Sequence, residues 1–294
     1  GDDVVATARG GYYAGGVLPD AQVDWQVAAS ASTFAPPGYD DFQFGDVRPW
    51  WRPYDTLPMA KGYAVSSVSP IGEPATREHT GRTDAAGEHR IAIDLSSVEP
   101  IAPVSFQAQA TVQDVNRQAW SGSAALLVHP ARYYVGVRLG SGFVEPGEDV
   151  AIEAIVVDLD GTVVLDRAIA VTTERVEWVR RGGTSVEDRQ PGPGCELTSG
   201  DTPAKCSLRF DKGGEHRITA TIEDLDGRVN RTTVTLQVSG GTIPYDGGLE
   251  ADRVTLVPDA REYQPGDTAR ILVQAPFAPA EGLLTLQRAG LVRS

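Results

Sequence analysis

The phrase Gly147-Glu-Asp-Val-Ala151, which follows Val144-Glu-Pro146, is the most informative stretch of the 294-residue sequence because it recurs. A close copy, Gly266-Asp-Thr-Ala-Arg270, follows Tyr263-Gln-Pro265, and the chain opens on Gly1-Asp-Asp-Val-Val5, the same phrase without its leader. Phrases that recur at roughly domain spacing indicate a tandem array of related modules. The third copy has too little chain after it for another full module, so we expect a piece of a longer protein.

A second phrase recurs as Gly87-Glu-His-Arg-Ile91 and Gly214-Glu-His-Arg-Ile218. This repetition predicts that His89 and His216 occupy equivalent positions in the modules. A shared structural role is then a better interpretation than two separate active sites.

Short apolar runs separated by turn signals predict strands. Residues 150–158 alternate along the run and end in the turn Asp158-Leu-Asp-Gly161; residues 217–224 end in a near copy, Asp224-Leu-Asp-Gly227; residues 230–238 show period two. Asp-Gly after an alternating run is a strong hairpin signal. The sequence therefore predicts an all-β fold of tandem immunoglobulin-like antiparallel β-sandwiches, each of roughly 110 to 130 residues.

Segments rich in turn-forming residues predict a division of the chain into three domains. We expect residues 1–129 to form a sandwich with an aromatic and proline-rich insertion, residues 130–241 a sandwich with a cysteine loop, and residues 242–294 the incomplete start of a third.

Composition excludes several classes of function. The net charge of −14 argues against a nucleic-acid partner, which would need clustered Lys and Arg. No run of 18 apolar residues is present to span a membrane.

The two cysteines, Cys195 and Cys206, close a short loop rich in turn formers. They lack histidines at zinc-ligand spacing, so a disulfide is a better interpretation than a metal site. A disulfide implies an oxidising compartment such as the periplasm or the cell exterior.

The insertion between Ala35 and Glu73 carries Trp50, Trp51 and Tyr54, a candidate contact surface for a sugar or a protein. The alternative, which we favour from the sequence, is that the aromatic residues of this insertion pack back onto their own sandwich.

The sequence predicts no enzyme, no catalytic residue, no cofactor and no metal site. The four histidines do not show metal-ligand spacing, and neither a Gly-x-Ser-x-Gly elbow nor a phosphate loop is present. The two Asp-Leu-Asp-Gly segments lack the further oxygen ligands of a calcium loop and are predicted to be hairpin turns.

Several phrases together resemble the macroglobulin-like domains of bacterial alpha-2-macroglobulins. They are Gly10-Gly-Tyr-Tyr-Ala-Gly-Gly16, Thr83-Asp-Ala-Ala-Gly87, Tyr134-Val-Gly-Val137 with the turn at 158–161, and Tyr263-Gln-Pro-Gly-Asp267. The resemblance follows the same order of domains over essentially the whole chain.

The resemblance implies a fragment of a broad-spectrum protease inhibitor that acts in bacterial defence by a bait-and-trap mechanism. It implies trapped proteases as partners, a periplasmic or cell-envelope location, membrane attachment only through a lipid anchor outside this chain, and a periplasmic penicillin-binding protein as a further partner. The family's thioester motif is Cys-x-Glu-Gln; Cys195-Glu-Leu-Thr198 departs from it, so no thioester is predicted here.

Two other functions share this architecture. One is an extracellular adhesin or carbohydrate-binding array of β-sandwiches, and the other is an accessory region of a secreted enzyme. Fold alone does not choose between them and the inhibitor.

Overall fold

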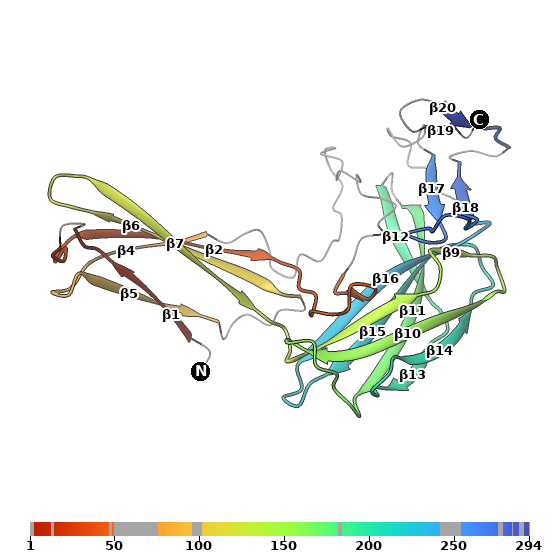
Figure 1. The fold of residues 1–294 in the computed structure, drawn as a ribbon, viewed down its shortest axis with the longest axis horizontal. Coiled ribbons are helices and arrows are strands. Elements are labelled where there is room, and N and C mark those ends of the chain that lie inside the picture. The colour runs from red at the N-terminus through yellow and green to blue at the C-terminus, as the bar shows by residue number, and fades with distance from the viewer. Residues whose placement is uncertain are drawn as a thin grey trace.

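In the computed structural model every regular element of the described residues is a β-strand, as the fold class predicted. The structure describes residues 3–12, 15–46, 49, 76–95, 102–181, 184–241, 254–275, 279–283, 285–287 and 291–293. Within these ranges the strands form two large bodies and a smaller C-terminal set of strand pairs (Figure 1). No helix in the described part of the chain could cross a membrane.

The first sandwich packs a two-stranded sheet against a four-stranded one. The two-stranded sheet pairs β1 (Asp3–Arg9) with β5 (Glu88–Asp94), and the second sheet has the order β4 (Thr76–Arg82), β2 (Gln22–Ala31), β6 (Val104–Gln113) and β7 (Ala119–Val128). All these pairs are antiparallel. Alternate residues of β2 and β6 face the core, with Trp25 at its centre.

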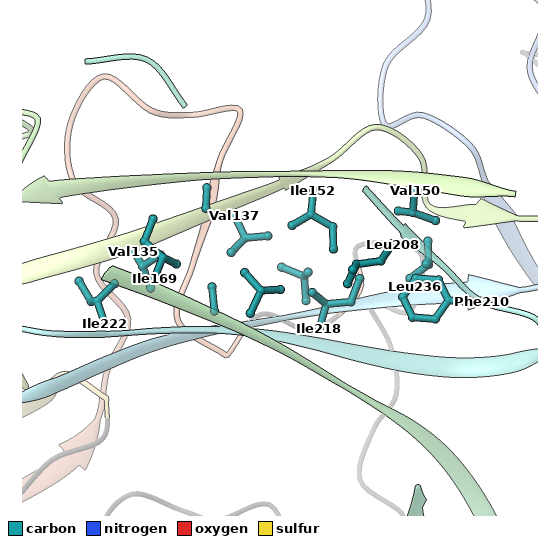
Figure 2. Close-up of a cluster of buried hydrophobic side chains, with 14 of the residues drawn as sticks. Val135, Val137, Val150, Ile152, Ile169, Leu208, Phe210, Ile218, Ile222 and Leu236 are labelled. Atoms are coloured by element: carbon teal, nitrogen blue, oxygen red, sulfur yellow. The ribbon is translucent and has the colours of Figure 1, made fainter. Parts of the chain in front are cut away.

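The second sandwich has a larger core between two longer sheets (Figure 2). One sheet has the order β14 (Ala204–Arg209), β10 (Asp149–Asp158), β8 (Tyr133–Leu139) and β3 (Gln43–Phe44). The other has the order β12 (Thr184–Pro191), β11 (Ala168–Arg181), β15 (Gly214–Glu223), β16 (Val229–Val238) and β9 (Phe143–Val144), with β13 (Cys195–Thr198) also on β11. Its pairs are antiparallel except that β9 runs parallel to β16.

The C-terminal region contains two antiparallel strand pairs. They are β17 (Thr255–Pro258) with β18 (Ile271–Gln274), and β19 (Leu286–Gln287) with β20 (Leu291–Arg293). The boundaries predicted at 129–130 and 241–242 fall between β7 and β8 and after β16, and they stay predictions.

The phrase that opens each repeat leads into corresponding strands, β1, β10 and β18. Before β10, the Glu148 N–H donates to the Glu145 carbonyl and the Glu148 carboxylate accepts from the Glu145 N–H. Before β18, Asp267 makes the same two bonds with Gln264. Both turns place a glycine at positive φ, where a side chain is disfavoured, which explains why the phrase keeps its glycine.

The equivalence predicted for His89 and His216 is wrong. His89 lies on β5, which pairs with β1, whereas His216 lies on β15 between β11 and β16. The strand that corresponds to β5 is β14, since both pair with the strand opened by the repeated phrase. The two similar phrases arise because both strands need alternating apolar residues, a pattern that does not identify which strand it belongs to.

Four turns share one aspartate-centred hydrogen-bond pattern, which confirms the two Asp-Leu-Asp-Gly turns predicted from sequence. Asp84, Asp114, Asp158 and Asp224 each accept two backbone N–H groups on Oδ1, from the residues two and four positions later. The fourth residue of each turn has positive φ; it is glycine in three turns, but in the turn of Asp114 it is Arg117, with φ of 65°.

Replacing Arg117 with glycine is expected to stabilise the chain. A non-glycine residue in the left-handed region costs about 1–2 kcal/mol, partly offset by the extra chain entropy of glycine, so the net gain is about 0.5–1 kcal/mol. Denaturant unfolding of Arg117→Gly measures it, and Gly227→Arg is the matched reverse change in the equivalent turn. Equal stability of Arg117→Gly and the parent chain would contradict the interpretation.

Candidate functional site: the junction between the first two sandwiches

A segment that leaves the first sandwich after β2 becomes an edge strand of the second. Gln43 and Phe44 of β3 pair with Val137 and Gly136 of β8. The Gly45 N–H donates to Thr232 Oγ1 at 2.8 Å, and the Gly45 carbonyl accepts from the Thr233 N–H at 3.0 Å. These hydrogen bonds fix the segment to β8 and β16 of the second sandwich.

Aromatic side chains of this segment are buried on the outer face of the second sandwich. Phe42 and Phe44 form a cluster with Tyr134, Ile155 and Val157, and Phe34 and Tyr39 pack at its margin. Burying a phenylalanine side chain contributes about 1.5–3 kcal/mol to the free energy of folding, so the cluster stabilises the contact between the segment and the second sandwich. The expectation that the insertion's aromatic residues pack on their own sandwich is therefore wrong for Tyr39, Phe42 and Phe44.

Gly136 makes room for this packing. A Cβ at Gly136 would lie 2.6 Å from Phe44 Cζ, closer than any real contact. Any side chain at Gly136 would therefore displace the Phe44 ring.

A second group of contacts lies where β7 passes into β8. His129 Nδ1 lies 2.8 Å from the Tyr134 hydroxyl, and the His129 and Phe34 rings pack in a T-shaped arrangement with centroids 4.7 Å apart. Burial lowers the pKa of His129 from its ordinary value, because the charged imidazolium is poorly solvated there. His129 is therefore neutral at pH 7 and acts as a packing and hydrogen-bonding group.

Asp224 joins its hairpin turn to the junction. Its Oδ2 accepts the Arg132 N–H at 3.0 Å, while Asp226 accepts from the Arg132 guanidinium at 3.0 Å. Burial alone would raise the pKa of the Asp224 carboxyl, but the N–H groups of Arg132, Arg228 and Asp226 outweigh burial and hold the pKa below its ordinary value.

Arg138 anchors the segment on the same outer face of β8 as Tyr134. Its guanidinium bonds Asp41 of the segment and Glu153 of β10, and lies 4.5 Å from the centroid of Phe42. Hydrogen bonds from Lys205 and from Arg138 hold the pKa of Glu153 below its ordinary value. Arg138 thus pairs with two carboxylates beside an aromatic face.

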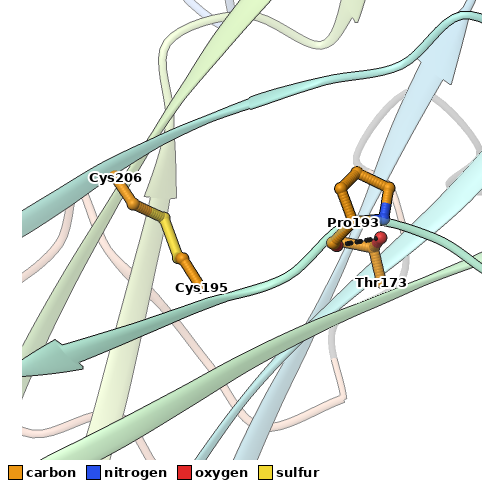
Figure 3. Close-up of a disulfide and its surroundings, with 4 residues drawn as sticks. All are labelled: Thr173, Pro193, Cys195 and Cys206. Atoms are coloured by element: carbon orange, nitrogen blue, oxygen red, sulfur yellow. Dashed lines mark hydrogen bonds between the residues drawn. A yellow bond between two sulfur atoms is a disulfide. The ribbon is translucent and has the colours of Figure 1, made fainter.

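The disulfide predicted between Cys195 and Cys206 is present (Figure 3). It joins β13, which pairs with β11, to β14, which pairs with β10, so it links the two sheets of the second sandwich. The Cα atoms are 6.7 Å apart. Nearby, Thr173 Oγ1 donates to the Pro193 carbonyl at 2.6 Å and fixes the approach to β13.

The remaining sequence candidates do not form a site in the described residues. Trp50, Trp51 and Tyr54, the candidate contact surface, lie outside the described residues. His216 is buried against Phe210 and its Nε2 lies 2.9 Å from the Lys212 carbonyl. No cluster of metal-ligating side chains occurs within the ranges that the structure describes.

The fold and the junction define a class of protein: tandem macroglobulin-like β-sandwiches in which β3, a strand that follows β2 of the first sandwich, is added to a sheet of the second. No protein-family model matches the chain. An alpha-2-macroglobulin homolog from Nostoc is 24% identical in an alignment of 291 positions that covers 96% of this chain and 14% of that protein.

Two solved structures of bacterial alpha-2-macroglobulin share the fold. The native conformation of the Escherichia coli protein matches with a TM-score of 0.53 and 18% identity over 94% of this chain and 18% of that one. Its trypsin-activated form matches with a TM-score of 0.52 and 18% identity over 99% of this chain and 19% of that one. The resemblance stated from the sequence is confirmed: the chain is a relative of the bacterial alpha-2-macroglobulins and spans between 14% and 21% of the length of those it matches.

Removing the disulfide is expected to lower the stability of the second sandwich. Closing a loop with a sequence separation of 11 residues contributes about 3 kcal/mol in the chain-entropy account, so Cys195→Ser with Cys206→Ser loses about that amount. Denaturant unfolding measures it. As a control, dithiothreitol lowers the stability of the parent chain and leaves the double variant unchanged; equal sensitivity of both would contradict the prediction.

Asp224→Ala is expected to destabilise the chain by about 2–3 kcal/mol at pH 7, because it leaves buried N–H groups without an acceptor. Asp158→Ala is the matched control, because Asp158 caps the same kind of turn but does not accept the Arg132 N–H, which bonds Asp224, and a smaller loss is expected. Equal losses would show that the Arg132 bond contributes nothing.

The pH dependence of this effect has a defined sign. Because the folded pKa of Asp224 lies below its ordinary value of 3.8, its stabilisation is complete above about pH 5 and is lost as the pH falls through the folded pKa. The difference in unfolding free energy between the parent chain and Asp224→Ala should therefore shrink below about pH 4. A difference that stays constant down to pH 2 would contradict this assignment.

Proposed function

We propose that this chain is a frame segment of a broad-spectrum protease inhibitor of the alpha-2-macroglobulin type. The observation that carries the proposal is similarity to the Nostoc homolog along 96% of the chain. In this proposal the chain itself is not an enzyme, and the bait and any reactive group belong to other parts of the longer protein.

The junction supports a frame role. Short ties between sandwiches make each module contact mainly its neighbours, as in other repeat arrays. The edge strand β3 and the cluster around Phe44 join the first two sandwiches by side-chain packing as well as by the covalent chain. A protein that changes shape after cleavage needs such segments to move as units.

Proteases are the proposed partners of the longer protein. Two of the structurally similar proteins are described as E. coli alpha-2-macroglobulin activated by trypsin and by porcine elastase. A periplasmic or cell-envelope location, a lipid anchor and a penicillin-binding protein partner stay predictions from the resemblance. No observation on the described residues favours the adhesin or carbohydrate-binding alternative.

Mixing the longer protein with trypsin tests the proposal on a denaturing gel. A bait-and-trap inhibitor is expected to be cut at one or a few adjacent sites and to shield trypsin from a protein substrate while small peptides are still cleaved. A high-mass adduct that methylamine pretreatment abolishes would add a thioester to the mechanism. Indifference to trypsin, or indiscriminate digestion without any shielding, would contradict the proposal.

A further inference from the structure

The first sandwich has a groove between two strand edges that pair with nothing in the described residues. One edge belongs to β1, which pairs only with β5, and the other to β7, which pairs only with β6. Between them lies a groove of about 520 Å³, lined largely by small and apolar residues that include Ala6, Ala8, Trp25, Trp120 and Ala124.

The second sandwich has strands at the corresponding place. There β8 runs antiparallel along β10, and β9 runs parallel along the end of β16. The repeated opening phrase makes β1 the counterpart of β10. The shared aspartate turns, at Asp114 and Asp224, make β7 the counterpart of β16. The groove of the first sandwich is thus the position of β8 and β9 in the second.

Burial of corresponding side chains shows what the first sandwich lacks. On β16 the core-facing Asn230, Thr232 and Val234 are 2%, 0% and 1% exposed. Counting from the aspartate turns, their counterparts on β7 are Trp120, Gly122 and Ala124; all three are exposed, Trp120 at 49%. Apolar side chains that face a sandwich interior are ordinarily covered.

Strand β8, together with Gly45 of the preceding segment, accounts for this difference. Asn230 Oδ1 accepts the Val135 N–H at 3.0 Å, and the Thr232 hydroxyl donates to the Val135 carbonyl at 2.5 Å. Val135 and Val137 of β8 fill the core beside them. A strand in the first sandwich would cover Trp120 and Ala124 in the same way.

We propose that this groove receives an extended strand of the longer polypeptide, antiparallel to β1 and then parallel to β7. This inference rests on the proposed function only in taking the chain as part of a longer protein. The strand carries apolar residues at alternate positions, facing Trp25. The donor is placed in the same polypeptide because the phrase at 147–151 follows its own donor strand, β9, through the turn at 145–148. The phrase at residues 1–5 is the same phrase.

The size of the groove suits such a strand. Counting from the shared turns, Ala108 of β6 stands where β15 has Ile218, and Ala124 of β7 stands where β16 has Val234. These two core-facing residues are smaller than their counterparts, so valine side chains like those of β8 enter beside them without over-packing.

A grafted strand tests the inference on the full chain. Residues 132–146 are duplicated in front of Gly1, so that Pro146 of the copy precedes Gly1 as it precedes Gly147. The matched control carries Val135→Asp and Val137→Asp in the copy only. Amide hydrogen exchange of β1 and β7 is measured, together with acrylamide quenching of Trp120, which is identified by subtraction of Trp120→Phe. Unchanged exchange in β15 and β16 shows that each variant is folded.

The graft is expected to slow exchange along the free edge of β1 about tenfold or more and to shield Trp120, while the control graft does neither. Unchanged exchange with the graft, or equal protection by the control, overturns the inference. Protection that appears only with dimers in light scattering assigns the strand to a second copy and overturns the same-chain donor. No readout of this experiment uses a protease. A negative result with the graft therefore does not contradict the inhibitor proposal, and a negative result with trypsin does not contradict the proposed strand in the groove.

Discussion

The packing of Phe44 against Gly136 is the contact on which the arrangement of the first two sandwiches depends. Because Gly136 has no side chain, the ring reaches the backbone of β8, and β3 then extends the sheet by Gln43 and Phe44. The neighbouring contacts follow from that placement. Arg138 reaches Asp41, and Gly45 reaches Thr232 only when β3 lies along β8.

The two junctions of the chain differ in chemistry. The first buries an aromatic cluster, whereas polar and cation–π contacts join the second sandwich to the C-terminal strands. There the Gly142 N–H donates to the Asp259 carbonyl, the Gln274 amide donates to Gln237, and Arg270 lies 5.3 Å from the centroid of Phe143. Apolar burial contributes more than exposed polar contacts, so we expect the first two sandwiches to move together and the C-terminal strands to move relative to them.

Local rules predicted much of the fold. Alternation of apolar residues located β10, β15 and β16, and Asp-Gly pairs located their turns, because both signals depend on neighbours in the chain. The disulfide could be predicted for the same reason, because its two cysteines are close together in the sequence. The sequence did not predict the position of β3: nothing local distinguishes aromatic residues that pack on their own module from those that pack on the next. Gly136, in Tyr-Tyr-Val-Gly-Val, was the available signal, since a glycine inside a strand often marks close approach of another segment.

The central claim is that the segment at 34–46 holds the first two sandwiches in one orientation. Double electron–electron resonance tests it most directly by measuring the distance distribution between spin labels at Ser123 on β7 and Glu196 on β13. The labels are attached to non-natural amino acids so that the disulfide stays intact. The account predicts one narrow distance distribution that Phe44→Ala broadens, while Phe106→Ala, a change in the core of the first sandwich alone, leaves its centre in place. A distribution that is already broad in the parent chain, or one that Phe44→Ala leaves unchanged, would contradict it.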